Sequence, residues 1–489
     1  MSIRPWVIVE PPDSRGIRKI TINGSTVGSA WSLREMRQVL RRHNYPDNMD
    51  IEDQACVYWR GGDSSAWPDN AWRRHVVITL MGVGLFGSMA MHVVIGWPDA
   101  LGALTFAQRL VGILFLLAAA EQGIATLAVV DHWGKRQLRF SGSLVLLGVL
   151  IALATSSLLL FLWLQERELI PGLLAFLSLW LWSLWALCVL IREKVWQQIP
   201  YPKKFALGVA VTALLTAISL GYSTLYQPTS TPLHIVLKAE FGKPETGPDL
   251  PYILVPLRLY AKNDGGVSAI ILVDDYTVYG RAAKFSAAGQ KMKEWKKGWE
   301  DDWWGLEAGR YESNVKDTRI ASGQFQGPGS TLASGEEFRK EAMVKFPKKT
   351  DYETLEARLQ LAFLRRDRGK IDDGFYFPKA SWLKREDGYY CDPKECIEQL
   401  IYYGGVRHNN NLINVTRKPR HVVAFWSPEE EPDALISSFS FKNRKKNESI
   451  YEVYGNPEEL ETERNRYDLG WVAVNSEVPV QGILKNSKS

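Results

Sequence analysis

Five long apolar runs constrain this chain more than any other feature of its sequence. A helix needs about 20 mostly apolar residues to cross the hydrocarbon core of a bilayer. Five runs meet that length: Val76–Gly96, Leu104–Val130, Ser143–Leu164, Leu169–Ile191 and Phe205–Tyr226. Buried helices of a large water-soluble protein are the alternative, but short polar turns between such long runs favour a membrane bundle. The sequence therefore predicts a multi-pass membrane protein that sits in the lipid bilayer.

The basic residues of the short loops predict the orientation, because cytoplasmic loops carry an excess of lysine and arginine. One side carries nine of them: Arg73, Arg74, Lys135, Arg136, Arg139, Arg192, Lys194, Lys203 and Lys204. The other side carries three: Arg167, Lys238 and Lys243. We expect a cell-membrane protein with a cytoplasmic N-terminus and, after an odd number of spans, an extracytoplasmic C-terminal domain.

The spans divide the chain into three expected domains. Residues 1–75 form a cytoplasmic α/β domain, residues 76–226 a five-helix transmembrane domain, and residues 227–489 an extracytoplasmic β-rich domain. The first 75 residues lack the short apolar run of a cleavable signal peptide, so the first span is expected to start insertion. A net charge of +5 over 489 residues gives no indication of nucleic acid as a partner.

The cytoplasmic domain shows strand and helix signals. Strands are expected at Trp6–Glu10, Ile17–Ile22 and Ala55–Trp59, with a turn at Asn23-Gly24. Ser32 and Glu35 form a capping box that opens a helix, whose apolar face holds Leu33, Met36, Val39 and Leu40.

Three arginines, Arg34, Arg37 and Arg41, share the outer face of that helix. They are candidates for binding a cytoplasmic protein partner or acidic lipid headgroups. A merely solvated face is the alternative, since charge runs on surface helices are common.

The C-terminal region alternates like antiparallel β structure, most simply a sandwich. Strands are expected at Ile235–Ala239, Ile253–Ala261, Ser268–Thr277, Phe338–Phe346, Thr354–Phe363, His421–Trp426, Ile436–Phe441 and Leu469–Val474. Helical inserts are expected at Ala282–Trp303 and Pro393–Tyr402.

Two clusters in this region are candidate sites. Cys391 and Cys396 close a small loop that suits a disulfide in an oxidising space, with a free or metal-bound pair as the alternative. Trp295, Trp299 and Trp303 recur every four residues. One interpretation is an exterior aromatic platform that contacts a glycan or the outer surface of the membrane. The alternative is one face of an amphipathic helix docked on the sheet.

Glu121 is the most informative residue within the spans, and Gln122 follows it. A carboxylate in the middle of a bilayer is costly and often functional. It indicates either an ion or proton path, or a protonated side chain that bonds a neighbouring helix through Thr155, Ser156 or Ser157.

A glycine pattern in the first span matches a dinucleotide-binding fingerprint in its letters alone. That motif requires a strand before it and a helix start after it, and here it lies inside an apolar span. Gly82, Gly84, Gly87 and Ser88 instead predict a small-residue face for close helix packing.

Catalytic signals are weak. Ser381 and Lys384 fit a four-residue Ser–Lys pattern without its companion motifs. The histidines His234, His408 and His421 lack metal-ligand spacing. We expect no cofactor and no metal.

Three segments carry a family resemblance: Ala30–Glu35, Trp59–Gly62 and Pro98–Ala107. Through them, and in its overall plan, the chain is similar to uncharacterised five-span membrane proteins of actinobacteria. Some bacterial membrane proteins of this plan accompany contractile injection systems, so the resemblance implies a large assembly as a context.

Three functions follow as hypotheses. The first is a non-enzymatic membrane adaptor or receptor that links a cytoplasmic partner of residues 1–75 to the exterior β-rich domain. The second is an ion or proton channel, transporter or pore-forming effector centred on Glu121. The third is an enzyme acting on cell-wall material at the outer face.

Overall fold

The chain divides into two compact units in a computed structural model. The first comprises Met1–Gly221 together with Asn411–Arg417, and the second comprises Tyr222–Asn410 and Lys418–Ser489. The structure describes residues 7–12, 16–46, 49–64, 71–134, 140–193, 195, 232–245, 250–285, 296, 312–385, 388–389, 398–438 and 457–486.

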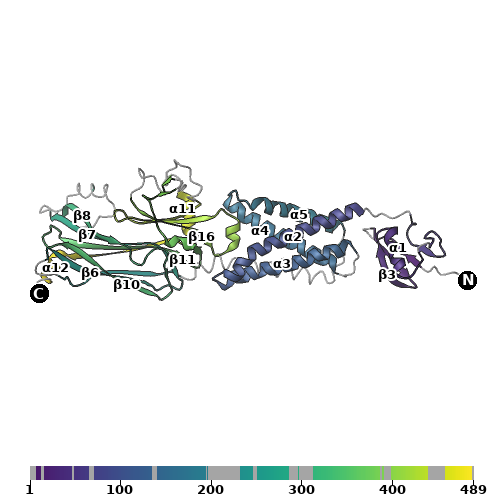
Figure 1. Cartoon of the computed structure of the whole chain (residues 1–489), viewed down its shortest axis with the longest axis horizontal. Coiled ribbons are helices and arrows are strands. Elements are labelled where there is room, and N and C mark those ends of the chain that lie inside the picture. The colour runs from purple at the N-terminus through teal and green to yellow at the C-terminus, as the bar shows by residue number, and fades with distance from the viewer. Residues whose placement is uncertain are drawn as a thin grey trace. The chain divides into compact units, whose positions relative to one another are not determined.

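The first unit begins with a small α/β module (Figure 1). Its sheet has the order β3-β2-β1-β4, made of β1 (Val7–Val9), β2 (Arg18–Ile22), β3 (Ser25–Ala30) and β4 (Val57–Trp59). The β2–β3 turn has positive φ at Asn23 (51°) and Gly24 (83°), as the Asn-Gly hairpin signal predicts. Strand β3 was not predicted, because it is a largely exposed edge strand without an apolar alternation.

Helix α1 (Leu33–Arg42) confirms the predicted capping box. The Ser32 hydroxyl accepts a hydrogen bond from the Glu35 N–H at 3.3 Å. The Glu35 carboxylate in turn accepts one from the N–H of Trp31, one residue before the cap, at 3.0 Å. Met36 and Leu40 are buried against the sheet, in a core with Val7, Val9 and Val57.

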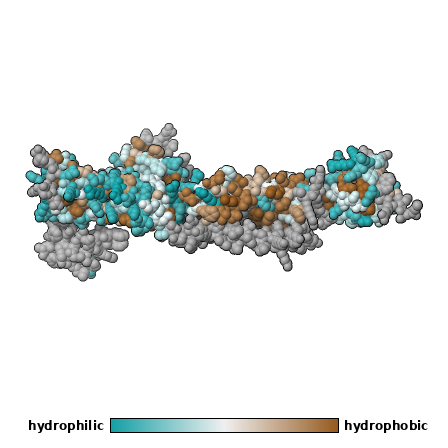
Figure 2. Space-filling view, turned by 90° about the horizontal axis from the view of Figure 1, so that it is seen from below, coloured by the Kyte–Doolittle hydropathy of each residue, from teal (hydrophilic) through white to brown (hydrophobic). Residues whose placement is uncertain are grey.

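Within the described residues, four helices follow that are long and apolar enough to cross a membrane. They are α2 (Ala71–Gly102), α3 (Phe106–Trp133), α4 (Ser141–Glu166) and α5 (Leu173–Arg192). They coincide with the first four predicted spans, and hydrophobic residues predominate on the face of these helices that Figure 2 shows. The fifth predicted span, Phe205–Tyr226, lies outside the described residues.

The second unit is rich in β-sheet, as expected. One sheet has the order β10-β6-β5, a second β19-β11-β7-β8 with β9 beside β7, and a third β12-β16-β17-β18 with β13 beside β16. The strands are β5 (Ile235–Phe241), β6 (Tyr252–Asn263), β7 (Ala269–Phe285), β8 (Glu312–Gly323), β9 (Thr331–Leu332), β10 (Glu337–Pro347), β11 (Thr354–Arg365), β12 (Gly369–Ile371), β13 (Lys379–Ala380), β14 (Lys384–Arg385), β15 (Gly388–Tyr389), β16 (Leu400–His408), β17 (Arg420–Trp426), β18 (Asp433–Ser437) and β19 (Gly470–Pro479).

Strands β7 and β11 connect two hydrophobic cores. Their residues Ile271 and Leu359 pack with Leu257 of β6 in one core. Residues on the opposite face, Leu272 among them, pack with Val422 of β17 in the other. The short helices among the described residues of this unit are η3 (Asp373–Tyr376), α11 (Pro457–Tyr467) and α12 (Val480–Asn486).

Two helix predictions in this region are wrong at the end of each that the structure describes, although Lys296, within the first of them, is helical. Strand β7 runs on to Phe285, and its Ala282 pairs with Lys316 of β8, so the chain is extended where a helix was expected to start. Strand β16 likewise includes Leu400 to Tyr402. Strand pairing overrides local helix signals in both places, and the remainder of both predicted helices lies outside the described residues apart from isolated positions.

Candidate functional site

Helix α2 contains a proline, Pro98, two residues beyond the predicted end of the first span. Proline has no backbone N–H, so the carbonyl one helical turn earlier, that of Val94, loses its usual donor. The side-chain amide of Asn411 donates to that carbonyl at 3.3 Å and to the carbonyl of Ile95 at 3.0 Å. A residue 317 positions later in the chain thus supplies the donor that the helix lacks.

The next residue of α2, Asp99, binds the backbone of the same asparagine. Both of its carboxylate oxygens lie 3.1 Å from the N–H of Asn411, and its side chain is buried. Asn411 opens the short helix α9 (Asn411–Val415). A carboxylate beside the first N–H groups of a helix satisfies donors that have no partner within it.

Leu412 anchors α9 in an apolar pocket of the helices. Its side chain is fully buried, and it packs with residues of α2, α3, α4 and α5 and of the segment leading into α5: Ile95, Val111, Phe115, Leu159, Phe176 and Ile170. Burying a leucine contributes roughly 1.5–3 kcal/mol. We call Pro98, Asp99, Asn411, Leu412 and the carbonyls of residues 94 and 95 the Pro98 junction.

Close packing of α2 on α3 supports the junction. A Cβ added at Gly96 would lie 2.7 Å from Cβ of Phe115, and one added at Gly112 would lie 2.3 Å from the backbone nitrogen of Ala100. Both distances are shorter than a carbon contact allows, so the two helices can approach this closely only because these residues are glycines.

A buried chain of polar groups links α2, α3 and α4. The Gln122 amide donates to the Ser88 hydroxyl at 2.9 Å. His92 Nδ1 lies 2.8 Å from the Ser88 carbonyl, and His92 Nε2 lies 2.9 Å from the Thr155 hydroxyl. A carbonyl only accepts, so Nδ1 of His92 must carry a proton. In the neutral ring the Thr155 hydroxyl then donates to Nε2.

Glu121 precedes Gln122 in the middle of α3. Both of its carboxylate oxygens are buried and have no hydrogen-bond partner among the described residues. A Cβ added at Gly148 of α4 would lie 3.5 Å from one of them. The hydroxyl of Ser156, an expected partner, instead donates to the carbonyl of Ala152 at 2.7 Å, and that of Ser157 accepts from the Trp180 indole at 3.0 Å.

The start of α1 contacts the ends of the membrane-length helices. The Trp31 indole donates to the carbonyl of Gly134, just after α3, at 3.0 Å. Arg74, in the first turns of α2, lies over the Trp31 ring at 4.7 Å and 3.6 Å from the Glu35 carboxylate. Glu35, the acidic residue of the capping box of α1, therefore also forms an ion pair with Arg74 of α2.

The glycine face of α2 divides into tight and open positions. A Cβ at Gly84 would lie 1.9 Å from the Trp182 ring of α5, whereas one at Gly87 would make an ordinary contact at 3.7 Å to Leu179. Around Gly82 there is open space. Ser88 is fully buried. Close packing therefore needs glycine at Gly84 above all, where Trp182 also donates to the carbonyl of Leu80 at 2.9 Å.

The structure brings the other predicted site residues to no common point. Arg34, Arg37 and Arg41 lie exposed on α1. Cys391, Cys396, Trp295, Trp299 and Trp303 lie outside the described residues.

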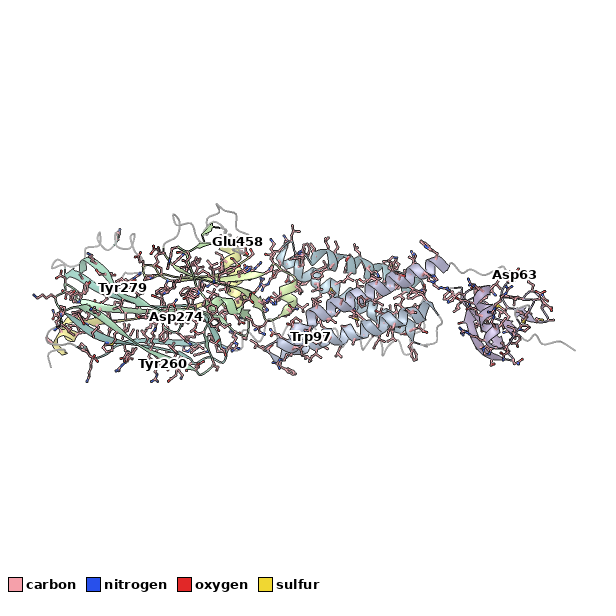
Figure 3. All side chains as sticks on the ribbon, viewed as in Figure 1. Asp63, Trp97, Tyr260, Asp274, Tyr279 and Glu458 are labelled. Carbon is pink, nitrogen blue, oxygen red and sulfur yellow. The ribbon has the colours of Figure 1, made fainter. Side chains whose placement is uncertain are left out.

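The β10-β6-β5 sheet carries a groove of about 590 Å³ on the second unit. The side chains of Lys238 and Arg339 lie over the Tyr260 ring, at 5.7 and 5.5 Å, and Tyr260 is labelled in Figure 3. Arg258 pairs with Glu341 at 3.3 Å. Charged and aromatic side chains therefore face outward together.

Within the described part of the chain, no group of three or more His, Cys, Asp or Glu side chains could hold a metal ion.

Sequence reasoning missed the Pro98 junction and His92. Proline within an apolar helix, followed by Asp99, is a visible signal of an open carbonyl. The partner asparagine carries no such signal, because Asn409, Asn410 and Asn411 form a plain polar run between two strands. Only the tertiary structure selects Asn411 among the three.

No family model matches the chain, and no curated protein does. Among solved structures, the chain is similar to a protein described as ApaA from Bordetella pertussis, with 12% identity over 28% of this chain and 82% of that one, at a TM-score of 0.16. A structural genomics target solved by X-ray crystallography shows 10% identity over 27% of this chain and 74% of its own, at a TM-score of 0.15. Scores this low support no conclusion about fold or function.

Proposed function

We propose that the chain is a non-enzymatic, multi-pass membrane adaptor. In this proposal five helices cross the cell membrane, the α/β module lies in the cytoplasm, and the β-rich domain lies outside. The module binds a cytoplasmic partner, and the exterior domain receives a protein or glycan partner.

One observation carries the proposal. The chain leaves the β-rich unit after Asn410, contributes residues 411–417 to the helical unit, and returns to the β-rich unit at Lys418. A loop that served only to connect β16 to β17 would need no such excursion. The contacts of Trp31 and Arg74 tie the α/β module to the same helices.

The surfaces for the two partners follow from exposure and charge. Arg34, Arg37 and Arg41 present a basic stripe on α1, suited to an acidic face of a cytoplasmic protein. The groove around Tyr260 offers charged and aromatic side chains on the exterior domain. The resemblance to five-span actinobacterial proteins makes a contractile injection system the first large assembly to test as a partner.

Site-specific photo-crosslinking tests the adaptor. A photoreactive phenylalanine analogue replaces Arg37 in the full-length protein, which is expressed in the organism that naturally produces it. A matched control carries the analogue at Lys19, an exposed residue of β2. We expect one discrete cytoplasmic protein to be captured from position 37 and not from position 19. Capture of lipid alone, or the same pattern from both positions, would refute partner binding through α1.

Ion or proton conduction centred on Glu121 is the second candidate function. The two buried carboxylate oxygens without a described partner favour it, because an ionisable residue within a span is a functional candidate. Glu121→Gln should strongly reduce ion or proton flux into proteoliposomes, because it removes the ionisable group. The control Glu240→Gln, on β5, should leave the flux unchanged. Equal flux in both variants would remove this candidate.

A further inference from the structure

The outer face of the β10-β6-β5 sheet is charged, whereas its inner face is apolar. Inner residues such as Leu237 and Leu259 are buried in a hydrophobic core. Because neighbouring strands lie about 4.8 Å apart, one bound molecule can contact outer side chains of all three strands. The strand register sets these side chains in rows, and two adjacent rows line the groove: Lys238, Tyr260 and Arg339 in the first, and Glu240, Arg258 and Glu341 in the second.

Two carboxylates of β10 orient the middle of both rows. Glu337 accepts a hydrogen bond from the Tyr260 hydroxyl at 3.1 Å, and its other oxygen lies 2.8 Å from Nη2 of Arg339. In the second row, Glu341 lies 3.3 Å from Nε of Arg258. The tyrosine ring and both guanidinium groups are therefore positioned by the protein itself.

Strand β5 presents two charges that are not paired in this way. Lys238 and Glu240 are exposed, and neither forms an ion pair with another described residue. The Lys238 ammonium instead lies over the Tyr260 ring, at 5.7 Å. Alternate residues of a strand are about 7 Å apart, so the groove offers one available cation beside one available anion.

We infer that this groove binds an acidic glycan, with the carboxylate of an acidic sugar between Lys238 and Arg339 and the neighbouring hydroxyls on Glu240. Lys238 and Arg339 both lie over the Tyr260 ring, at 5.7 and 5.5 Å, so a carboxylate bound there meets two positive charges. The inference specifies the exterior partner of the proposed adaptor and rests on that function.

Glu240 favours a sugar over an acidic peptide. An ionised carboxylate only accepts hydrogen bonds, so Glu240 needs a donor from the ligand. An acidic sugar presents hydroxyl donors beside its own carboxylate, whereas the side chains of an acidic peptide supply no donor and are repelled by Glu240. The groove, at about 590 Å³, lies within the range of roughly 300–1,000 Å³ that is usual for ligand sites.

Calorimetric titration of the full-length protein in detergent with trigalacturonate tests the site. We expect saturable binding, and Lys238→Gln or Arg339→Gln should weaken it at least about threefold, the effect expected of one exposed charged contact. The matched control is Lys345→Gln. Lys345 also lies over a tyrosine ring, that of Tyr252 at 3.9 Å, but it is about 20 Å along β10 from Arg339.

Glu240→Ala separates the acidic glycan from a general attraction of anions. Loss of the acceptor should weaken trigalacturonate binding at least about threefold, whereas a merely electrostatic site would bind any anion more tightly once this negative charge is removed. Unchanged or tighter binding after Glu240→Ala would overturn the inference. All of these positions are exposed, so each variant should unfold at the same temperature as the natural protein, which is measured alongside.

Two further probes complete the test. The neutral trisaccharide maltotriose should not bind, and a triglutamate peptide should bind at least about threefold more weakly than trigalacturonate. Equal binding of triglutamate, or no binding of trigalacturonate, would overturn the acidic glycan site. Neither result bears on the partner of α1 or on the membrane topology of the adaptor, which have their own tests.

Discussion

Asp274 of β7 shows how a single buried acid contributes to the β-rich unit (Figure 3). Its side chain is fully buried. One carboxylate oxygen accepts from the N–H groups of Gln326 and of Gly327, the latter at 2.8 Å. The other is buried without a hydrogen-bond partner among the described residues. Burial raises the pKa of Asp274 against the opposing effect of these N–H donors. Burial also raises the pKa of the neighbouring Asp275.

This arrangement predicts a pH dependence of stability. The folded state holds the Asp274 proton more tightly than the unfolded chain does, so the resulting stabilisation is fully present below the ordinary pKa of about 3.9. It is lost as pH rises through the raised pKa. Asp274→Asn should therefore flatten the decline in the free energy of unfolding as pH rises above about 4, as measured by denaturant titration followed by tryptophan fluorescence.

The control for this prediction is Asp433→Asn, at an exposed position on β18. It should leave the pH dependence as it is in the natural protein. If Asp274→Asn gave the same slope as this control, Asp274 would not hold its proton more tightly in the folded state. Asp275 contributes with the same sign, so a residual slope is expected after Asp274→Asn.

At the scale of elements, the sequence predicted those helices and strands that have a long or repeating apolar pattern. The first four apolar runs coincide with α2 to α5, because a helix of membrane length leaves a long and unambiguous signal. Strand β3 and helix α9 were not predicted, because neither has a repeating pattern in the sequence. An exposed edge strand needs no alternation, and a helix of five residues is stabilised by Asp99 and by burial of Leu412 rather than by its own pattern.

For the candidate site, the sequence predicted individual residues but not the contacts between them. Ser88 could be selected from the sequence as part of a small-residue face, and Gln122 because polar residues are rare in apolar spans, but the hydrogen bond between them could not be predicted. Glu121 stood out for the same reason, but its expected hydroxyl partners Ser156 and Ser157 bond elsewhere. Contacts between distant segments, such as Asn411 with α2, depend on tertiary structure that no local pattern records.

The packing of α2 against α5 gives a prediction at this scale. Gly84→Ala places a methyl group 1.9 Å from the Trp182 ring, whereas Gly82→Ala meets open space. Overpacking of this kind costs about 1–3 kcal/mol. The Gly84→Ala protein should therefore unfold at a clearly lower temperature in detergent than the natural protein, and Gly82→Ala at nearly the same temperature. Equal unfolding temperatures for the two variants would show that these helices do not pack as described.

At the scale of the whole molecule, the number of membrane crossings decides the account. Four described helices can cross a membrane, and the run Phe205–Tyr226 is predicted to be a fifth. Five crossings place the α/β module and the β-rich domain on opposite sides, as an adaptor requires. Four crossings would place both on the same side, where no signal needs to pass through the bilayer.

Cysteine accessibility in intact cells measures directly on which side of the membrane the α/β module and the β-rich domain lie. In a background with Cys56, Cys188, Cys391 and Cys396 changed to serine, a single cysteine is introduced as Gln38→Cys on α1 or as Asn475→Cys on β19, both at exposed positions. The account predicts that a membrane-impermeant maleimide labels position 475 in intact cells and labels position 38 only after lysis. Labelling of both positions, or of neither, in intact cells would contradict it.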